Sequence, residues 1–543
     1  MDFQRRTLLA IVLCVLIWIG YAAFLAPPPP EPKKEPDKVA VKSDDDAPAP
    51  SKSGDASATP AAADSKPAAP EVAAVKHRLT TDLLSLEVGN IGGMVKRTEL
   101  LSPQFRRGEV GDDFLALGEK SSLAVSFDAE HDDEKLDLHI PRSAGWEVVE
   151  KTEKQWKLRY KTLDAEVTAD LTLTDGYEGK FAVKVFNRSS KRQSHRMLVR
   201  MQHGLAKEES SYDIHRGLCA TGEDDIEEFA QGDVGETPGR SQGKVRWAGL
   251  DSKYFLQALV PENTVNSCEV ALNDGVMVNT IGSDRVELEP NEAKTYTFGV
   301  YYGTKEVERL ERYAVVPGKH LEDAVEWGWF GGLTRFLGEK MLWLLRMFYG
   351  LTGIWGVAII LLTIVVKVLT LPLTFKQMSS MKRMKEIQPE LEALKKKYAD
   401  DRVRQAQEMQ ALFQRSGVKP LAGCLPMLVQ LPIWIALYAM LNTAVELYRE
   451  PFLWLPDLTQ QDPYYVLPLA MGALMFFQMR MSPSGMDNEQ AKMMAWMMPI
   501  IFTVMMLFLP SGLGVYIFAN VVLSLIQTAI QLRTSPKAAA KKS

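Results

Sequence analysis

Six apolar runs divide this chain of 543 residues, and each is about 17 to 25 residues long, the length at which an α-helix can cross a lipid bilayer. Inside a bilayer every backbone N–H and C=O must be hydrogen-bonded within the protein, so an apolar run that crosses it has to be helical. The sequence therefore predicts an α-helical integral membrane protein with six spans, five of which lie together in the C-terminal part. The runs cover residues 7–26, 351–373, 421–445, 464–481, 493–509 and 512–532.

The segments between the runs differ strongly in their basic residues. Residues 376–419 contain eleven lysines and arginines, whereas residues 446–463 contain only Arg449. Two arginines precede the first run, and four basic residues lie in the tail, residues 533–543. Because positively charged loops stay in the cytoplasm, we expect both termini and the 376–419 segment there. The region between the first two runs is then periplasmic, and the protein belongs in the inner membrane of a Gram-negative bacterium.

The N-terminal part resembles a signal peptide in its charge order, but its apolar run is long enough to span the bilayer. It also lacks the pair of small residues that a cleavage site needs. We interpret residues 1–26 as an uncleaved membrane anchor. Residues 27–76 contain eleven of the chain's 30 prolines and few apolar side chains. This composition predicts a disordered, extended linker.

Residues 77–320 contain short segments in which apolar and polar side chains alternate. The segment DLTLTDGYEGKFAVKVFNRS, residues 170–189, alternates on both sides of a glycine-containing turn and predicts a β-hairpin. Residues 146–163 and 294–303 alternate in the same way. We therefore expect a periplasmic β-sandwich of about 240 residues with few helices.

Residues 321–350 place apolar side chains at helical spacing, with charged residues between them. An amphipathic helix lying in the membrane surface has this pattern, with tryptophans such as Trp327 at the level of the lipid headgroups. A short core helix is the alternative interpretation.

Apolar residues also recur every three or four positions on both sides of the sequence YADDR, residues 398–402. This pattern predicts a cytoplasmic helical hairpin, residues 376–418, whose second helix is capped by Asp400 or Asp401. Its basic residues form either a solvated charged face or a docking surface for ribosomes and targeting factors. The candidate docking residues are Lys382, Arg383, Lys385, Lys395, Lys396 and Lys397.

The sequence lacks the residues that several functional classes of protein need. All seven histidines lie between His77 and His320, and no Gly-Lys pair precedes Ser or Thr as a Walker-type phosphate loop requires. The last five runs contain no Asp or Glu, which ion-coupled transporters usually place near mid-membrane. We therefore expect no ATPase, no protease, no coupled carrier, and neither a metal site nor a cofactor. The nearly balanced charge, 63 basic against 68 acidic residues, gives no argument for nucleic acid.

Two of the four cysteines, Cys219 and Cys268, lie in the soluble part. They could form a disulfide in an oxidising compartment, but the sequence does not give their distance. Nineteen of the 24 methionines fall between Met341 and Met506. They form either an adaptable surface that accepts many sequences or ordinary lipid-facing filler.

One cation, Lys367, lies within the second apolar run, where it costs roughly 3 kcal/mol on insertion scales. Thr363 lies four residues earlier, on the same face of the predicted helix. Pro372, near the cytoplasmic end of this run, is about 7.5 Å further along a helix than Lys367. The long side chain of Lys367 could extend that far and place its ammonium at the cytoplasmic interface. Alternatively, the protein keeps water beside it.

Polar residues on two other runs favour the second possibility. Tyr516, Asn520, Ser524 and Gln527 follow spacings of four, four and three on the last run, and Gln430 begins a weaker stripe on the run 421–445. Polar groups that face lipid cost several kcal/mol each, and converging around water avoids this. We therefore predict a wet pocket between these helices.

Three motifs follow one another in the C-terminal part: GCLPMLVQLPIWIALY at 423–438, DPYYVLPLAMG at 462–472 and MMPIIFTVMMLFLPSGLGVYIFAN at 497–520. In order and spacing they resemble the YidC family of membrane protein insertases, which is related to the Oxa insertases of mitochondria. The anchor, the periplasmic domain and the five-span core correspond to the Gram-negative form of that family.

The resemblance implies a core of five helices around a hydrophilic groove, open to the cytoplasm and to lipid but closed to the periplasm. It also implies that the periplasmic domain is a β-supersandwich related to sugar-binding folds. The family carries a groove arginine where this chain has Lys367, which keeps the charge but loses the forked geometry of arginine. The expected groove residues are Lys367, Thr363, Gln430, Tyr516, Asn520, Ser524 and Gln527.

We therefore expect an insertase and chaperone, not an enzyme, that helps integral membrane proteins insert, fold and assemble, alone or with the Sec translocon. A short polar flank of a nascent transmembrane segment would enter the groove, while its apolar part slides along the runs 421–445 and 493–509 into lipid. The hydrophobic slide is expected at Met427, Ile433, Leu437, Met498, Phe502 and Met505.

The expected partners are nascent membrane proteins, the Sec components SecYEG and SecDF, the ribosome, the signal-recognition-particle receptor and membrane lipid. Two other functions remain possible from the residues alone. One is a small-solute channel or carrier, and the other is a membrane-anchored periplasmic carbohydrate-binding protein.

Overall fold

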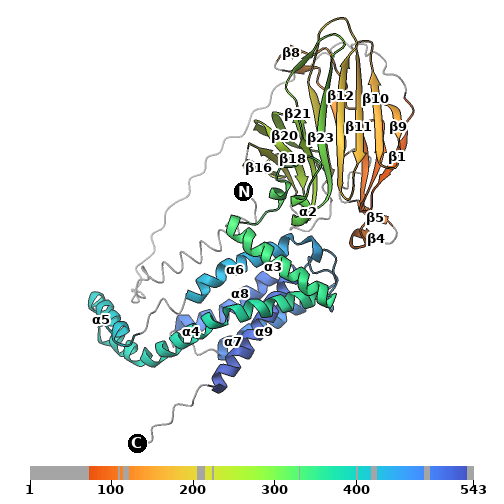
Figure 1. Cartoon of the computed structure of the whole chain (residues 1–543). Helices are drawn as coiled ribbons and strands as arrows, with labels where there is room; N and C mark the ends of the chain where they lie inside the picture. The colour runs from red at the N-terminus through yellow and green to blue at the C-terminus, as the bar shows by residue number, and fades with distance from the viewer. Residues whose placement is uncertain are drawn as a thin grey trace, which may run out of the picture. The chain divides into compact units, whose positions relative to one another are not determined.

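The structure, a computed structural model, contains a large all-β domain followed by a helical region (Figure 1). Both parts of the predicted fold class are confirmed, whereas the number of membrane spans stays a prediction. The predicted anchor, most of the linker and the end of the tail lie outside the described residues. The structure describes residues 72–107, 110–113, 122–131, 133–204, 215–222, 225–235, 237–328, 331–398, 401–417, 425–481 and 489–534.

Two large antiparallel sheets form the β domain. The first is a 10-stranded sheet with the order β1-β2-β3-β6-β14-β21-β20-β17, in which β5 also pairs with β3, and β4 pairs with β5. Its strands are β1 (Lys76–Thr80), β2 (Leu84–Gly89), β3 (Val95–Leu100), β4 (Arg106–Arg107), β5 (Val110–Asp113), β6 (Leu123–Phe127), β14 (Met197–Gly204), β17 (Gly239–Gln242), β20 (Ser267–Asn273) and β21 (Val276–Gly282).

The second sheet is 9-stranded, with the order β16-β15-β18-β19-β23-β12-β11-β10-β9. Its strands are β9 (Glu147–Lys151), β10 (Gln155–Lys161), β11 (Ala165–Leu173), β12 (Glu178–Asn187), β15 (Arg216–Thr221), β16 (Asp225–Ala230), β18 (Val245–Asp251), β19 (Phe255–Pro261) and β23 (Ala293–Thr304). Two small sheets pair β7 (Glu130–His131) with β8 (Glu134–Lys135) and β13 (Gln193–His195) with β22 (Val286–Leu288).

The alternation in the sequence sets which face of each strand is buried. Along β11, every second side chain from Ala165 to Leu173 is buried and the others are half-exposed. Strand β11 pairs with β12 in an antiparallel register that places Leu171 opposite Phe181. The hairpin predicted at residues 170–189 is therefore confirmed, and its apolar face packs into the core between the sheets.

A buried group of charges lies where the β domain meets the segment that enters the helical region. Asp251 is fully buried and accepts hydrogen bonds from Arg216, at 2.8 and 3.2 Å, and from Lys305, at 2.6 Å. Arg216 also donates to Glu326 at 2.7 Å. Burial alone would raise the pKa of Asp251, but the two cations outweigh it and hold the pKa below its ordinary value.

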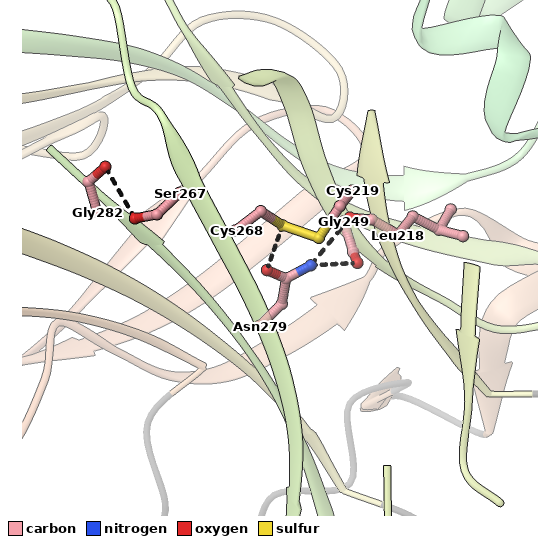
Figure 2. The surroundings of a disulfide bond; sticks show 7 residues. All are labelled: Leu218, Cys219, Gly249, Ser267, Cys268, Asn279 and Gly282. Atoms are coloured by element: carbon pink, nitrogen blue, oxygen red, sulfur yellow. Dashed lines mark hydrogen bonds between the residues drawn. A yellow bond between two sulfur atoms is a disulfide. The ribbon is translucent and has the colours of Figure 1, made fainter. Parts of the chain in front are cut away.

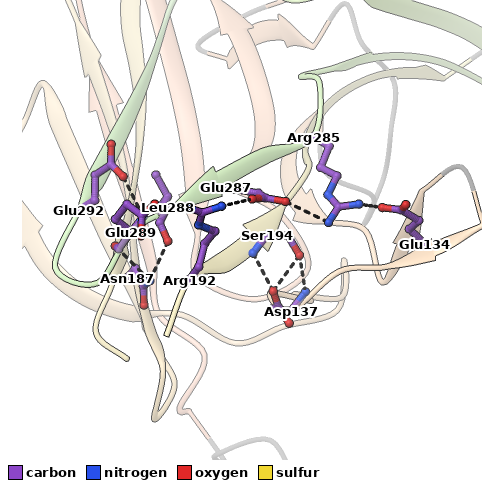
Figure 3. A network of polar contacts seen from close by, with 10 residues as sticks. All are labelled: Glu134, Asp137, Asn187, Arg192, Ser194, Arg285, Glu287, Leu288, Glu289 and Glu292. Carbon is purple, nitrogen blue, oxygen red and sulfur yellow. Dashed lines mark hydrogen bonds and ion pairs between the residues drawn. The ribbon is translucent and has the colours of Figure 1, made fainter. Parts of the chain in front are cut away.

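A second polar network lies on the surface of the same domain, around β13 and β22 (Figure 3). Arg192 and Arg285 each donate to the carboxylate of Glu287 at 3.2 Å. Asn187 donates to the carbonyl oxygen of Leu288 at 3.0 Å and so fixes the start of the turn that follows β22. The charged side chains of this network are open to solvent, so their pairing adds little stability.

The helical region begins later than the predicted interfacial helix. Residues Leu321–Ala324 form a 3₁₀ turn, η3, and helix α3 covers Gly331–Thr352. Trp327 lies before this helix and is buried. Its indole ring packs so closely on Gly338 of α3 that any side chain at that position would collide with it. A short helix, α2 (Val307–Glu311), links the β domain to this segment.

The remaining helices are α4 (Trp355–Lys397), α5 (Arg402–Arg415), α6 (Leu425–Thr443), α7 (Val466–Met481), α8 (Glu489–Met506) and α9 (Ser511–Thr534), with 3₁₀ turns η2 at Pro103–Phe105 and η5 at Val445–Leu447. Helix α4 is continuous over 43 residues, with Pro372 and Pro389 inside it. It joins the predicted second span to the first helix of the predicted hairpin. Among the described residues, Trp355–Phe375 and Ser511–Ile530 are long and apolar enough to cross a membrane, and Val466–Met479 and Met497–Met506 are shorter apolar helices.

The connection between α6 and α7 contacts the β domain. The side-chain amide of Gln104, in η2, donates to the carbonyl oxygens of Val445 at 2.9 Å and Tyr448 at 2.8 Å. The ring of Tyr448 packs between Phe105 and Phe255, with ring centroids 5.8 and 5.5 Å away. One amide donor and an aromatic cluster therefore fix this connection.

Helix α3 joins the same connection through an ion pair. Arg346 donates from Nε to Glu446 at 2.8 Å, and its Nη1 lies 2.7 Å from a carboxylate oxygen of Glu308 in α2. Burial alone would lower the pKa of Arg346, but the two carboxylates raise it.

Candidate functional site

Helices α4 and α9 pack against each other and carry the polar residues that the sequence analysis singled out. Both are helical because their long apolar runs leave the backbone no other partner in lipid. The first residues of α9 are held by the α6–α7 connection, since the amides of Ser511 and Gly512 donate to the carbonyl oxygens of Gln460 and Leu458, both at 2.7 Å. These bonds fix where α9 begins and so which of its residues face α4.

Lys367 of α4 reaches across to α9. Its ammonium lies 2.6 Å from Oγ of Ser524 and 3.2 Å from Oδ1 of Asn520, and all three side chains are half-buried. The hydroxyl of Ser524 donates in turn to the carbonyl oxygen of Asn520 at 2.7 Å, which leaves its lone pairs for the lysine. The structure thus places Lys367 together with two of the predicted groove residues.

Thr363 and Tyr516 are placed differently. Thr363 is 1% exposed and donates its hydroxyl to the carbonyl oxygen of Ile359, one turn earlier, at 2.7 Å. This bond satisfies the hydroxyl within its own helix. Tyr516 is also 1% exposed and lies in the packed core. Neither residue has a hydrogen bond to Lys367 in the described part of the chain.

The two glutamines of the predicted groove stay apart from the lysine. Gln527 lies on α9 beyond Ser524, and its buried side-chain nitrogen has no hydrogen-bond partner among the described residues. A buried amide without a partner is costly, so this atom favours the approach of a polar group. Gln430 is half-buried on α6 and makes no described contact with Lys367. Of the three polar faces, those of α4 and α9 meet through Lys367, Asn520 and Ser524, and a convergence of all three around water stays a prediction.

The predicted hydrophobic slide is unevenly exposed. Met498 on α8 is open, Ile433, Phe502 and Met505 are partly buried, and Leu437 on α6 is fully buried in the core. The side chain of Met427 lies outside the description. Two residues that the sequence analysis did not single out, Ile501 and Val504, are open on α8. Their spacing of three residues from Met498 and from each other is the signal that could have identified them.

The α6–α7 connection closes one end of the helical region. Asp462 is 4% exposed and accepts hydrogen bonds from the amides of Leu467 at 2.7 Å and Tyr464 at 3.0 Å and from the indole of Trp454 at 3.2 Å. A carboxylate held this way caps the start of α7. Asp462 lies within the second of the three family motifs, but no role was predicted for it. An Asp shortly before an apolar run was the available signal.

The residues of the predicted cytoplasmic docking surface all lie on the far part of α4, which α5 follows in the chain. Asp401 is the capping residue of α5, because its carboxylate accepts the amide of Arg404 at 3.0 Å. The amide side chain of Gln405 donates to the carbonyl oxygen of Lys395 at 3.1 Å and ties the two helices together. The side chains of Arg383, Lys395, Lys396 and Lys397 are exposed, whereas those of Lys382 and Lys385 lie outside the description.

Two family models match this chain, and together they cover most of it. The family described as "60Kd inner membrane protein" matches residues 347–538, and the family described as "YidC periplasmic domain" matches residues 76–344. The boundary between the two matches lies within α3, the first helix of the helical region.

Individual proteins are similar as well. A protein named membrane protein insertase YidC from Geobacter sulfurreducens is 33% identical over 565 aligned residues, which cover 99% of this chain and 100% of that protein. One of the same name from an Anaeromyxobacter strain is 44% identical over 321 residues, and the alignment spans only 57% of that relative's length. A crystal structure titled as an active YidC insertase is 18% identical, covers 84% of this chain and 92% of its own, and has a TM-score of 0.37.

Proposed function

The chain belongs to the YidC family of inner membrane proteins, and from this premise we propose that it inserts other proteins into the membrane. Its substrates are nascent integral membrane proteins, which it helps to insert, fold and assemble. Insertion takes place without a covalent step, so the protein acts as an insertase and chaperone and not as an enzyme. The β domain lies in the periplasm, and both termini and the α4–α5 hairpin lie in the cytoplasm.

The observation that carries this proposal is the cation between α4 and α9. Lys367 has two neutral acceptors, Asn520 and Ser524, which offset part of the cost of taking its ammonium out of water. They do not neutralise its charge, and the predicted spans of the core contain no Asp or Glu that could. The site therefore keeps a net positive charge for an acidic group that arrives from outside.

The physical benefit to a substrate is electrostatic. A carboxylate about 4 Å from an ammonium gains about 4 kcal/mol at an effective dielectric constant of 20, against about 1 kcal/mol in bulk water. The polar flank of a nascent transmembrane segment loses hydration when it enters the membrane, and Lys367 replaces part of that hydration. The barrier falls because the flank crosses a shorter dry distance.

The apolar part of the substrate then moves along α8 towards lipid. Met498, Ile501 and Val504 offer exposed side chains there, and flexible methionines adapt to many sequences. Transfer of the apolar segment from water into lipid supplies the driving force, at roughly 25 cal/mol per Å² of buried apolar surface. No nucleotide is needed for this step.

The α4–α5 hairpin receives the substrate. Its exposed lysines at the end of α4 suit an anionic surface such as the ribosome, the receptor of the signal recognition particle or the lipid headgroups. Some substrates reach this protein through the Sec translocon, with SecYEG and SecDF as neighbours in the membrane. Salt should weaken the contact with the hairpin, since exposed charges are screened.

The test exchanges the cation in cells that depend on this protein. We expect Lys367→Glu to block a single-span client with an acidic flank and to spare the same client with a neutral flank. Lys367→Arg should insert both, because it keeps the charge. Protease protection of the client's flank measures insertion, and equal expression of the variants is the folding control. Normal insertion of the acidic client by the Glu variant would refute the electrostatic role.

A further inference from the structure

A disulfide joins the two large sheets of the β domain. Cys219 lies in β15 and Cys268 in β20, with their Cα atoms 6.0 Å apart (Figure 2). Strand β15 belongs to the 9-stranded sheet and β20 to the 10-stranded sheet, so the bond links the two layers. The two cysteines are 0% and 1% exposed. The bond therefore lies inside the sandwich, where a reagent in solution does not reach it.

The surroundings of the disulfide hold the layers at close range. Asn279 of β21 is fully buried and donates its amide to the carbonyl oxygens of Leu218 at 3.0 Å and Gly249 at 2.9 Å, both in the opposite sheet (Figure 2). Next to Cys219, a methyl group at Gly217 would collide with the side chain of Val270 in β20. The two sheets therefore approach each other closely at this point, and the disulfide lies between them.

We propose that Cys219 and Cys268 are oxidised on the periplasmic side while the β domain folds, so that the chain is itself a substrate of a thiol–disulfide oxidant there. Thiols in the cytosol are kept reduced, whereas an extracytoplasmic compartment lets disulfides persist. Because both sulfur atoms are buried in the finished domain, they pair before the two sheets close over them. The inference rests on the proposed orientation of the protein and is independent of insertion through the Lys367 site.

The reaction is a thiol–disulfide exchange with a dithiol–disulfide protein as the oxidant. The thiolate of one cysteine attacks the oxidant's disulfide and forms a mixed disulfide, and one sulfur of the oxidant leaves as a thiolate. The second cysteine attacks the mixed disulfide and releases the other sulfur. Cys219 and Cys268 together lose two protons and two electrons, and the oxidant takes up both pairs as two thiols.

Thiol counting in cells tests the oxidation, and the full-length variant with Cys14→Ala and Cys424→Ala leaves only this pair. We expect no alkylation by a maleimide polymer in the unfolded, unreduced protein, and two alkylated thiols after reduction. In a host that lacks its periplasmic thiol oxidant, both thiols should be alkylated without reduction. Two free thiols in the normal host, or full pairing in the deficient host, would overturn the proposal.

Stability and access test the position of the bond. The purified protein with Cys219→Ala and Cys268→Ala should melt about 10 °C lower than the parent, since a long closed loop no longer limits the unfolded chain. Cys424→Ala, the matched control, should melt as the parent does. In the folded parent, a thiol reductant should open the bond many times more slowly than in urea, and equal rates would contradict burial.

These results are distinguishable from a failure of the proposed function. Client insertion by the Lys367 variants is measured in a separate experiment, with the disulfide present in every variant. Paired cysteines with no effect of Lys367→Glu would leave the oxidation standing and sink the insertion mechanism. Free cysteines together with a block of insertion by Lys367→Glu would overturn the oxidation and leave the insertion mechanism standing.

Discussion

Two buried or half-buried charged residues, Lys367 and Asp251, differ in how their charges are compensated. Lys367 is a cation held by neutral acceptors, and Asp251 is an anion held by two cations. The difference explains their roles. Asp251, Arg216 and Lys305 satisfy one another and serve the fold, whereas in the function that we propose the positive charge of Lys367 is available to a substrate.

The buried triad gives a prediction about stability. Asp251→Asn should lower the free energy of unfolding by about 3–5 kcal/mol, because Arg216 and Lys305 would stay buried without their anion. Chemical denaturation of the purified full chain, followed by tryptophan fluorescence, measures the loss. Glu287→Gln, in the solvent-exposed network of Figure 3, is the matched control and should change the midpoint far less. Equal effects of the two variants would contradict this account.

His195 makes stability depend on pH. It is 1% exposed, its Nε2 lies 3.0 Å from the hydroxyl of Tyr296, and burial, with a smaller effect of Lys294, lowers its pKa to about 4 from the ordinary 6.5. Between pH 6.5 and 4 the unfolded chain therefore binds more protons than the folded one. As the pH is lowered through this range, the free energy of unfolding should fall by about 1.4 kcal/mol per pH unit because of this group.

His195→Gln is expected to remove that contribution. Thermal melts of the variant and the parent at pH values from 4 to 7 compare the two slopes. The variant's midpoint should fall less steeply below pH 6.5 than the parent's. Two parallel curves would show that His195 does not titrate on unfolding.

At the scale of whole elements, the sequence predicted those features that depend on the spacing of side chains along one strand or helix. Alternation predicted the hairpin of β11 and β12, because a strand places every second side chain on one face. The spacing of Asn520 and Ser524 predicted a polar face on α9, and the structure brings Lys367 to it. The oxidation state of Cys219 and Cys268 could not be predicted, since pairing depends on how two distant strands meet across the core.

Other features depend on packing that one sequence does not reveal. The sequence predicted an apolar run that ends at residue 373 and a separate hairpin from residue 376, yet α4 runs without a break through Pro372 to Lys397. The burial of Leu437 depends on the rotation of α6 against its neighbours, and a uniformly apolar helix gives no periodic signal for that rotation. Thr363 shares a face with Lys367, but its hydroxyl is satisfied within α4 and not by a partner across the site.

The cap of α5 gives a prediction for the hairpin. Asp401→Ala should destabilise the first turn of α5 by about 1 kcal/mol, because the amide of Arg404 loses its acceptor. Hydrogen exchange of the amides at residues 402–405 should then be several times faster than in the parent. Asp401→Asn is the matched control, since an Asn side chain can accept the same bond. An unchanged exchange rate in the Ala variant would refute the capping role.

At the scale of the whole molecule, the contact between the β domain and the α6–α7 connection can be tested in the same way. Gln104→Met keeps the size of the side chain but removes the donor to Val445 and Tyr448. We expect hydrogen exchange in residues 444–450 to become several times faster, because two carbonyl groups lose their partner. Gln155→Met, which removes a surface bond to Asp170, is the control and should leave that segment unchanged. Identical exchange in both variants would mean that Gln104 does not hold the connection.

The continuous helix α4 has a mechanical consequence. At 1.5 Å per residue its 43 residues extend for about 65 Å, more than twice the thickness of the hydrocarbon layer. Proline lacks one backbone bond, so Pro372 is a cheap place for this rod to bend, five residues beyond Lys367. When a large partner pulls on the part of α4 beyond Pro372, that part can bend about Pro372. The ammonium of Lys367 meanwhile stays hydrogen-bonded to Asn520 and Ser524.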